Sequence, residues 1–290
     1  MSLSQLPLIL CNHLKESAGE LTDFRFAPGG CINHGGIIST KSDNYFLKWN
    51  QASKFPAMFE LEKKGLELLD GAEGIRVPEI ISTGEVDDFS YILLEYLRPS
   101  APGNDFWENF ATGLVKIHRS SNPQFGLNYD NYIGSLRQVN TFASSWSEFF
   151  IENRLLYQLK LGYDNSKISG SDAAKMEKII VHLQDRIPEE KPALLHGDLW
   201  SGNLITGSNG EPCLIDPAVY YGHREMDLAM SQLFGGFDEE YISIYNEIFP
   251  LESNFKSRFD IWNLYPLLAH LNLFGGGYLG RVKEILKAIQ

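Results

Sequence analysis

Four polar residues constrain this 290-residue chain more than any other feature. They are His196, Asp198, Asn203 and Asp216. The first three follow the pattern His-x-Asp-x-x-x-x-Asn, and Asp216 ends a short apolar run a little further on. These side chains are an imidazole, an amide and two carboxylates. If they lie buried together, each needs a hydrogen-bond partner.

The residues between Asn203 and Asp216 predict a β-hairpin. Two short apolar runs flank a stretch of Gly, Ser and Asn, which is typical of two strands joined by a turn. We expect the strands over 204–206 and 213–215 and the turn over 207–210. Pairing these strands would bring Asn203 and Asp216 to the same end of the hairpin.

The spacing of these residues is that of a kinase catalytic loop, His-x-Asp with an Asn five residues after the Asp. Phosphoryl transfer needs a base that orients the attacking hydroxyl and oxygen ligands for Mg²⁺. Asp198 suits the first role, and Asn203 and Asp216 suit the second, because Mg²⁺ uses few protein ligands and retains waters. An ordinary hairpin with solvated carboxylates is the alternative, and the complete ordered set disfavours it.

Two features upstream fit a nucleotide site. The stretch Gly29, Gly30, Cys31, Ile32, Asn33 places small residues between two strand-like runs, which predicts a hairpin whose backbone can approach phosphates closely. Further on, Lys48 interrupts the apolar alternation of a predicted strand. In a kinase, a strand lysine holds the α- and β-phosphates.

A glutamate on the following helix should pair with Lys48. The segment 59–69 is helix-like and offers Glu60 and Glu62. We choose Glu62 and keep Glu60 as the rival, because the sequence alone does not determine the rotation of the helix.

A predicted strand over 90–97 ends before Arg98-Pro99 and is a plausible connector between two lobes. In a kinase such a hinge binds the adenine edge, so Glu95, Tyr96 and Leu97 are candidate nucleotide-binding residues; a simple edge strand is the open alternative. We place the lobe boundary near 97–104, with a nucleotide-binding lobe over 1–97 and a catalytic and substrate-binding lobe over 98–290.

Helical patterns dominate the second lobe. Apolar residues at spacings of three and four predict long helices over 142–161 and 172–186, and a short amphipathic helix is predicted within residues 1–22. Asp227 lies where it could cap a helix or anchor the catalytic loop. The fold class is therefore α+β, with a small β-rich N-lobe and a larger, mainly helical C-lobe.

Composition narrows the class of protein. The chain is 43% hydrophobic and 21% charged, with a formal net charge of −12, which argues against nucleic acid as a partner. It contains no run of about 18 apolar residues, so we expect no membrane span. Three cysteines make no disulfide framework, and a cytoplasmic setting is expected. The Cys and His residues also lack zinc-ligand spacing.

Several motifs together resemble the fructosamine kinase (ketosamine 3-kinase) family, relatives of aminoglycoside phosphotransferases with a protein-kinase-like fold. The most particular are Leu-Trp directly after His-Gly-Asp and the block Tyr221-Gly222-His223-Arg224-Glu225. The others are Gly29 to Asn33, Phe46-Leu47-Lys48, Ile215-Asp216-Pro217-Ala218 and Leu271-Asn272-Leu273-Phe274-Gly275.

The resemblance implies ATP- and Mg²⁺-dependent phosphorylation of a sugar hydroxyl, O3, on a ketoamine of the fructosamine or ribulosamine type, which reverses glycation. It implies Asp198 as the base, Lys48 with Glu62 on the phosphates, residues 29–33 as the covering loop, and Trp200 facing the sugar or amine. The substrate would be a small ketoamine or a glycated protein.

The resemblance leaves some points open. The loop lacks the G-x-G-x-x-G register of protein kinases, so the amides that meet the phosphates are not assigned. Cys31 is a candidate redox-sensitive cysteine whose oxidation would link two subunits, so we expect a monomer or a homodimer. The alternatives are a kinase of another small hydroxyl compound, such as an aminoglycoside or choline, and a nucleotide-binding pseudokinase.

Overall fold

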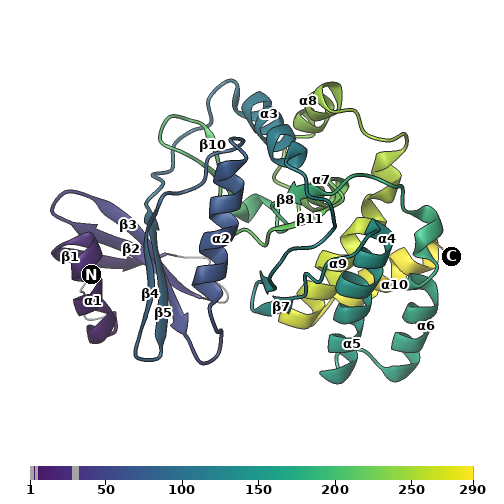
Figure 1. Cartoon of the computed structure of the whole chain (residues 1–290), viewed down its shortest axis with the longest axis horizontal. Helices are drawn as coiled ribbons and strands as arrows, with labels where there is room; N and C mark the ends of the chain where they lie inside the picture. The colour runs from purple at the N-terminus through teal and green to yellow at the C-terminus, as the bar shows by residue number, and fades with distance from the viewer. Residues whose placement is uncertain (1–2, 4–5, 28–32, 290) are drawn as a thin grey trace.

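The computed structural model describes residue 3, residues 6–27 and residues 33–289. A sheet-rich half and a helical half lie side by side, joined by the segment 96–105 (Figure 1). The lobe boundary near 97–104 stays a prediction. The arrangement confirms the predicted α+β class with a small β-rich part and a larger helical part.

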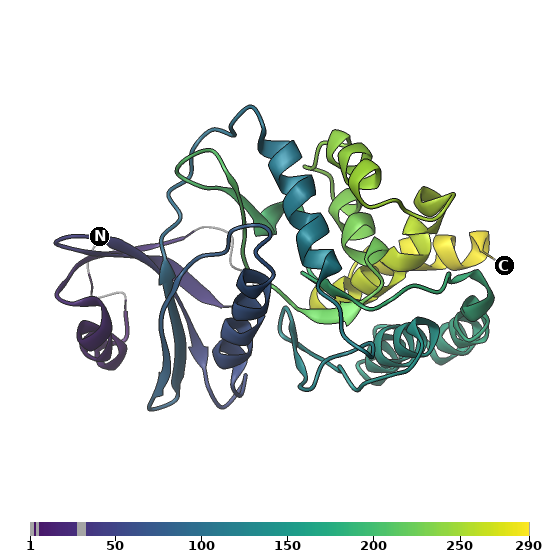
Figure 2. The same cartoon turned by 45° about the horizontal axis from the view of Figure 1, so that its top comes forward.

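The first half is a five-stranded antiparallel sheet in the order β1-β2-β3-β5-β4. One helix packs on each face, with α2 between the sheet and the helical half in both views (Figure 1, Figure 2). The elements are α1 (Leu8–Ala18), β1 (Leu21–Phe26), β2 (His34–Thr40), β3 (Asn44–Gln51), α2 (Met58–Gly71), β4 (Ile80–Val86) and β5 (Phe89–Glu95).

The alternation of β3 explains where Lys48 points. Successive side chains of a strand face opposite sides of its sheet. Leu47 and Trp49 lie in the core beneath α1, so Lys48 between them faces α2. The α2 side of the sheet presents Ile92 and Leu94 of β5 to the same helix.

The second half is built of helices around small two-stranded ladders (Figure 1). The helices are α3 (Phe106–Arg119), α4 (Trp146–Phe149), α5 (Tyr157–Asp164), α6 (Gly170–Ile180), α7 (Glu225–Leu233), α8 (Glu240–Ile248), α9 (Phe255–Phe274) and α10 (Tyr278–Ala288). The ladders pair β6 (Asn131–Ile133) with β7 (Leu136–Gln138), β8 (Ala193–Leu195) with β11 (Tyr220–Gly222), and β9 (Leu204–Thr206) with β10 (Pro212–Leu214).

Three predicted helices have different bounds. The first helix ends at Ala18, because Leu21 already pairs with Thr40 in the sheet. The helix predicted over 142–161 begins only at Trp146 and contains a π-helical stretch, Phe150–Leu156, before α5. The helix predicted over 172–186 is α6 followed by a separate 3₁₀ turn, Leu183–Arg186.

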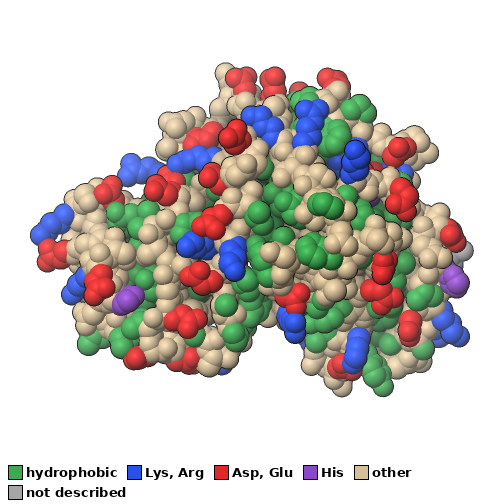
Figure 3. Space-filling view, in the orientation of Figure 1, with side chains coloured by type: hydrophobic (Ala, Val, Ile, Leu, Met, Phe, Trp, Pro, Cys, Tyr) green, Lys and Arg blue, Asp and Glu red, His purple; other side chains and the backbone are tan. Residues whose placement is uncertain are grey.

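Charged side chains are mixed on the face drawn in Figure 3. Lys and Arg side chains lie scattered among Asp and Glu, while hydrophobic side chains gather between the two halves.

Candidate active site

The β9–β10 hairpin brings Asn203 and Asp216 together, as the sequence predicted. Leu204 pairs with Leu214, and the Ile215 backbone N–H donates to the Asn203 carbonyl at 3.1 Å. Asn203 directly precedes β9, and Asp216 follows β10 after one residue. The amide and the carboxylate therefore lie at one end of the hairpin.

His196 is a structural residue of the loop that carries Asp198. Its Nε2 lies 3.0 Å from the Ile215 carbonyl, and its Nδ1 accepts from the Asp198 N–H at 3.2 Å. This geometry requires the neutral tautomer with the proton on Nε2. Burial lowers the pKa of His196, which favours the same neutral form. The ring thus ties the Asp198 loop to the end of β10.

Asp227 anchors the loop that carries Asp198 through two hydrogen bonds. Its two carboxylate oxygens accept from the N–H groups of His196 and Gly197, at 2.7 and 2.9 Å. Helix α7 begins at Glu225, so Asp227 is its third residue rather than its cap. Of the two roles considered for this residue, the hydrogen bonds support the anchor.

Glycine is the one residue type that fits at position 197. Its φ is +80°, in the left-handed region, and a Cβ there would lie 2.0 Å from the Ala218 carbonyl oxygen. The loop therefore packs directly on the backbone of the segment that follows Asp216.

Asp198 is held as a candidate base. The Asn203 Nδ2 donates to its Oδ2 at 2.9 Å and to its backbone carbonyl at 2.8 Å. Burial raises the pKa of Asp198 to about 7, the Asn203 hydrogen bond opposes the rise, and the charges of Asp216 and Asp227 add to it. A carboxylate with a pKa near neutrality suits proton transfer at that pH.

Lys48 joins the two halves of the molecule. Its Nζ lies 2.6 Å from Glu62 Oε1 on α2 and also contacts Asp216 Oδ1 of the helical half. Only 8% of the Lys48 side chain is exposed. Burial alone would lower the pKa of Lys48, but the Asp216 and Glu62 charges outweigh it and raise the pKa, so the ammonium stays charged.

The rotation of α2 distinguishes the two glutamates. Glu60 accepts a hydrogen bond from the Thr83 hydroxyl on β4, while Glu62 reaches Lys48. The structure thus forms the pair that we chose from the sequence.

Asp216 has the exposure and chemistry of a candidate cation ligand. Its φ is +55°, a left-handed conformation in which Asp and Asn are enriched, and 44% of its side chain is exposed. Because the Asn203 amide nitrogen is engaged by Asp198, its carbonyl oxygen is the atom that can ligate. Two oxygens fit Mg²⁺, which takes its other ligands from phosphates and water. Over residues 6–27 and 33–289, no group of three or more His, Cys, Asp or Glu could hold a metal by itself.

The predicted hinge is partly engaged in other contacts. The Glu95 carboxylate pairs with Arg76 and accepts from the Glu79 N–H, and the Glu95 N–H donates to the Glu79 carbonyl at 2.8 Å. Tyr96 and buried Leu97 follow outside any helix or strand. Their contact with adenine stays a prediction.

The candidate nucleotide loop is described only at its end. Asn33 accepts from Asn50 Nδ2 at 3.0 Å, on the face of β3 that also carries Lys48. Gly29, Gly30, Cys31 and Ile32 lie outside the described residues.

Trp200 is a partly exposed residue of the loop that carries Asp198. The residue is 38% exposed, and its ring centroid lies 6.4 Å from that of Phe234 in an edge-on arrangement. A Cβ on Gly202 would come within 2.3 Å of the indole, so this glycine leaves room for the ring.

The sequence did not indicate two groups of residues that support the candidate site. Arg76 links Glu95 of the hinge to Glu211 of the β9–β10 turn, at 3.0 Å from the latter. Buried Gln138 and Asn131 donate to the Ala218 and Val219 carbonyls, at 2.9 and 2.8 Å. Nothing in their sequence context distinguishes these residues, because their partners are distant in the chain.

The fold and this cluster of residues together define a class. A strand lysine is paired with a helix glutamate and contacts the Asp at the end of a hairpin, and the Asn at the same end holds a loop aspartate. This is the arrangement of protein-kinase-like phosphotransferases.

Comparisons with known proteins identify the family. Residues 8–290 match the family model of fructosamine kinase. A "probable ketoamine kinase" of Synechocystis sp. is 39% identical over 282 residues, covering 96% of this chain and 95% of that protein. The chloroplastic protein-ribulosamine 3-kinase of Arabidopsis thaliana is 38% identical over 278 residues, 93% of this chain and 83% of that protein.

A solved structure agrees. A protein from Haemophilus somnus, assigned as a fructosamine-3-kinase, matches with a TM-score of 0.88 at 29% identity, covering 97% of each chain. The chain belongs to the fructosamine kinase family, whose members are ATP-using phosphotransferases. Within the described part of the chain, every helix is too short or too polar to cross a bilayer.

Proposed function

We propose that this chain transfers the γ-phosphate of ATP to the O3 hydroxyl of a ketoamine sugar of the fructosamine or ribulosamine type, a deglycation activity. The observation that carries the proposal is the contact of Lys48 with both Glu62 and Asp216, at the end of the hairpin whose Asn203 holds Asp198. It is supported by the fructosamine kinase family match and by relatives named ketoamine kinase and protein-ribulosamine 3-kinase.

Asp198 is the proposed base. Its pKa of about 7 leaves a large share of the carboxylate ionised at neutral pH, ready to accept the proton of the sugar hydroxyl. The hydrogen bond from Asn203 orients that carboxylate, and the anchor through Asp227 fixes the loop that bears it. Positioning of the hydroxyl, rather than covalent chemistry, is the main task of such a site.

The proposed nucleotide ligands come from both halves. Lys48, oriented by Glu62, would contact the α- and β-phosphates, and residues Gly29 to Asn33 would cover them. Asn203 and Asp216 would hold Mg²⁺, which when bound supplies neutralisation of phosphate charge. Glu95, Tyr96 and Leu97 are the proposed hinge contacts of the adenine.

Trp200 is the proposed substrate contact, because its partly exposed ring lies two residues from Asp198. An indole face suits the apolar side of a sugar or the carbon chain of its amine.

We further propose a cytoplasmic location, which fits the free thiols of Cys11 and Cys213. The proposed substrate is either a small ketoamine or a glycated protein. The proposed assembly is a monomer or a homodimer.

A substrate panel tests the proposal. ATP consumption is measured with Nα-protected fructosyl-lysine, ribulosyl-lysine, an aminoglycoside and choline, with Asp198→Asn as the control. We expect turnover with a ketoamine, none with the other two, and a loss of about 10²–10⁴-fold in Asp198→Asn. Turnover confined to the aminoglycoside or choline would favour that alternative, and nucleotide binding without turnover would favour a pseudokinase.

A further inference from the structure

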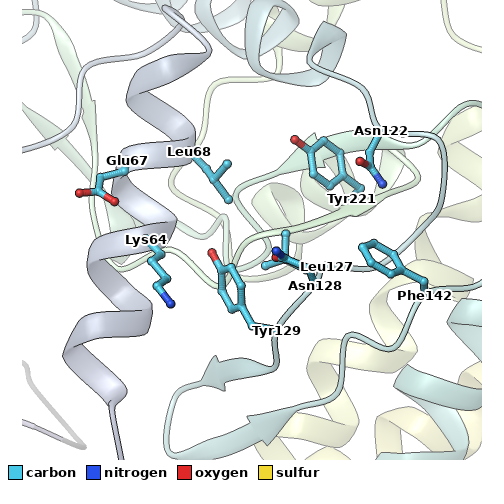
Figure 4. A pocket seen from close by; sticks show the side chains of 9 residues that line it. All are labelled: Lys64, Glu67, Leu68, Asn122, Leu127, Asn128, Tyr129, Phe142 and Tyr221. Carbon is cyan, nitrogen blue, oxygen red and sulfur yellow. The ribbon is translucent and has the colours of Figure 1, made fainter.

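A hollow lies between α2 and the helical half (Figure 4). Its volume is about 540 Å³, within the range of about 300–1,000 Å³ that holds small molecules. Leu68 of α2 forms one wall, and Leu127, Tyr129, Phe142 and Tyr221 of the helical half form the others.

The hollow is separate from the candidate active site. No residue of that site lines it. Lys64, at its edge, is two residues from Glu62, and two residues turn an α-helix by about 200°. The helix therefore presents Glu62 to Lys48 and Lys64 to the opposite side.

The edge of the hollow carries one lysine, Lys64, and one glutamate, Glu67. Lys64 Nζ lies 5.1 Å from the centroid of the Tyr129 ring, and none of the described carboxylates forms an ion pair with it. Glu67 also borders the hollow, but its carboxylate turns away (Figure 4). A ligand that places one negative charge beside Lys64 would gain a partner that the protein itself does not supply.

Tyr129 adds a hydrogen-bond donor to this edge. Its buried hydroxyl has no partner among the residues that the structure describes. Burial, with the charges of Glu67 and Tyr221, raises the pKa of Tyr129 to about 12, so the phenol keeps its proton. An unsatisfied buried donor is unfavourable, and an acceptor oxygen on a ligand would relieve it.

We propose that this hollow is a second ligand site, which takes a small aromatic monocarboxylate. The ring would pack against Phe142, Tyr221 and the two leucines, and the carboxylate would lie near Lys64 and the Tyr129 hydroxyl. Aromatic walls favour a planar ring, and a single cation favours a single negative charge.

Binding of a ligand in the hollow should be coupled to catalysis through α2. Gly65 of α2 packs against the segment that follows Asp216, because a Cβ on this glycine would come within 3.3 Å of Pro217 and 3.4 Å of Val219. A ligand that bridges α2 and the helical half stabilises this docked position, in which Glu62 holds Lys48. This coupling rests on the proposed function, whereas the binding itself does not. The ligand should therefore raise turnover with a ketoamine.

Naphthalene-2-carboxylate is a suitable probe, titrated into the full-length protein by ligand-observed NMR and calorimetry. We expect saturable binding at one site that AMP-PNP does not displace. The neutral naphthalene-2-carboxamide should bind about fivefold more weakly, and Lys64→Met should weaken the carboxylate by a similar factor. Lys63→Met, one residue along the helix, is the matched control and should leave binding unchanged.

The second test of the ligand site fills the hollow with a larger side chain. Leu68→Trp should abolish binding, and its folding is checked by circular dichroism; Lys64→Met, at the surface, tests the site even if Leu68→Trp does not fold. The proposal is overturned if no saturable binding occurs, if AMP-PNP displaces the probe, or if Lys64→Met binds it as well as wild type. Binding accompanied by reduced ketoamine turnover would overturn the coupling, and binding to a protein without kinase activity would leave the site intact while refuting the proposed function.

Discussion

Replacing Asp198 by Asn should stabilise the protein, and the gain should grow with pH. In the folded protein burial raises the pKa of Asp198 from 3.8 to about 7. A carboxyl whose folded pKa is raised binds its proton more tightly when folded, so stability falls as pH rises from about 4 to about 7. Asn has the same shape and carries no charge at any of these pH values, so the variant escapes this cost.

The size of the effect follows from the shift. About three pKa units correspond to about 4 kcal/mol at pH values above 7, at about 1.36 kcal/mol per unit. About 2.5 kcal/mol of this should appear between pH 5 and pH 8, because part of the cost is already present at pH 5. The Asn side chain can still accept from Asn203, so this hydrogen bond should persist.

Urea unfolding at pH 5 and pH 8, without nucleotide or Mg²⁺, measures the difference. The free energy of unfolding of Asp198→Asn minus that of wild type should increase by about 2.5 kcal/mol between the two pH values. The exposed Asp185→Asn serves as the control and should show no such increase. A pH-independent difference, or a variant less stable than wild type at pH 8, would refute the account of Asp198 as a buried, destabilised carboxylate.

Three further changes test the site. Asn203→Ala removes the hydrogen bond that lowers the pKa of Asp198, so the acidic limb of the pH profile of kcat/KM should move to higher pH; an unmoved limb would remove Asn203 from that role. Glu62→Gln should raise the KM for ATP about tenfold, whereas Glu60→Gln should change it little; equal effects in a steady-state assay would contradict the pairing. Gly197→Ala should lower the free energy of unfolding by at least about 2 kcal/mol in urea titrations, because its φ is +80° and the Cβ meets a carbonyl; a neutral effect would mean that the loop can relax.

The central hairpin was predictable because its signals are local. Two short apolar runs and a polar turn determine β9 and β10, and strand pairing then brings Asn203 and Asp216 together regardless of the rest of the chain. Lys48 was found in the same way, since a charged residue within an apolar strand marks a position of interest. The choice between Glu60 and Glu62 needed the structure, because it depends on how α2 is rotated by its packing.

Other features depend on long-range contacts and left no local signal. The π-helical stretch Phe150–Leu156 accommodates Arg154, which is fully buried against the rings of Phe149 and Tyr220, and periodicity alone predicted a regular helix there. Arg76 pairs with carboxylates 19 and 135 residues away. The hollow between α2 and the helical half is likewise formed by segments that only the tertiary fold brings together.

Phosphorus NMR of a reaction with ribulosyl-lysine or fructosyl-lysine, ATP and Mg²⁺ tests the central claim most directly. The wild-type protein should produce a new sugar-phosphate resonance, with coupling to the proton on C3, as ADP accumulates, and Asp216→Asn should not. Asn tolerates the left-handed backbone at this position, so its loss of activity would report on the carboxylate. ATP hydrolysis without a sugar-phosphate, or full product formation by Asp216→Asn, would contradict the account.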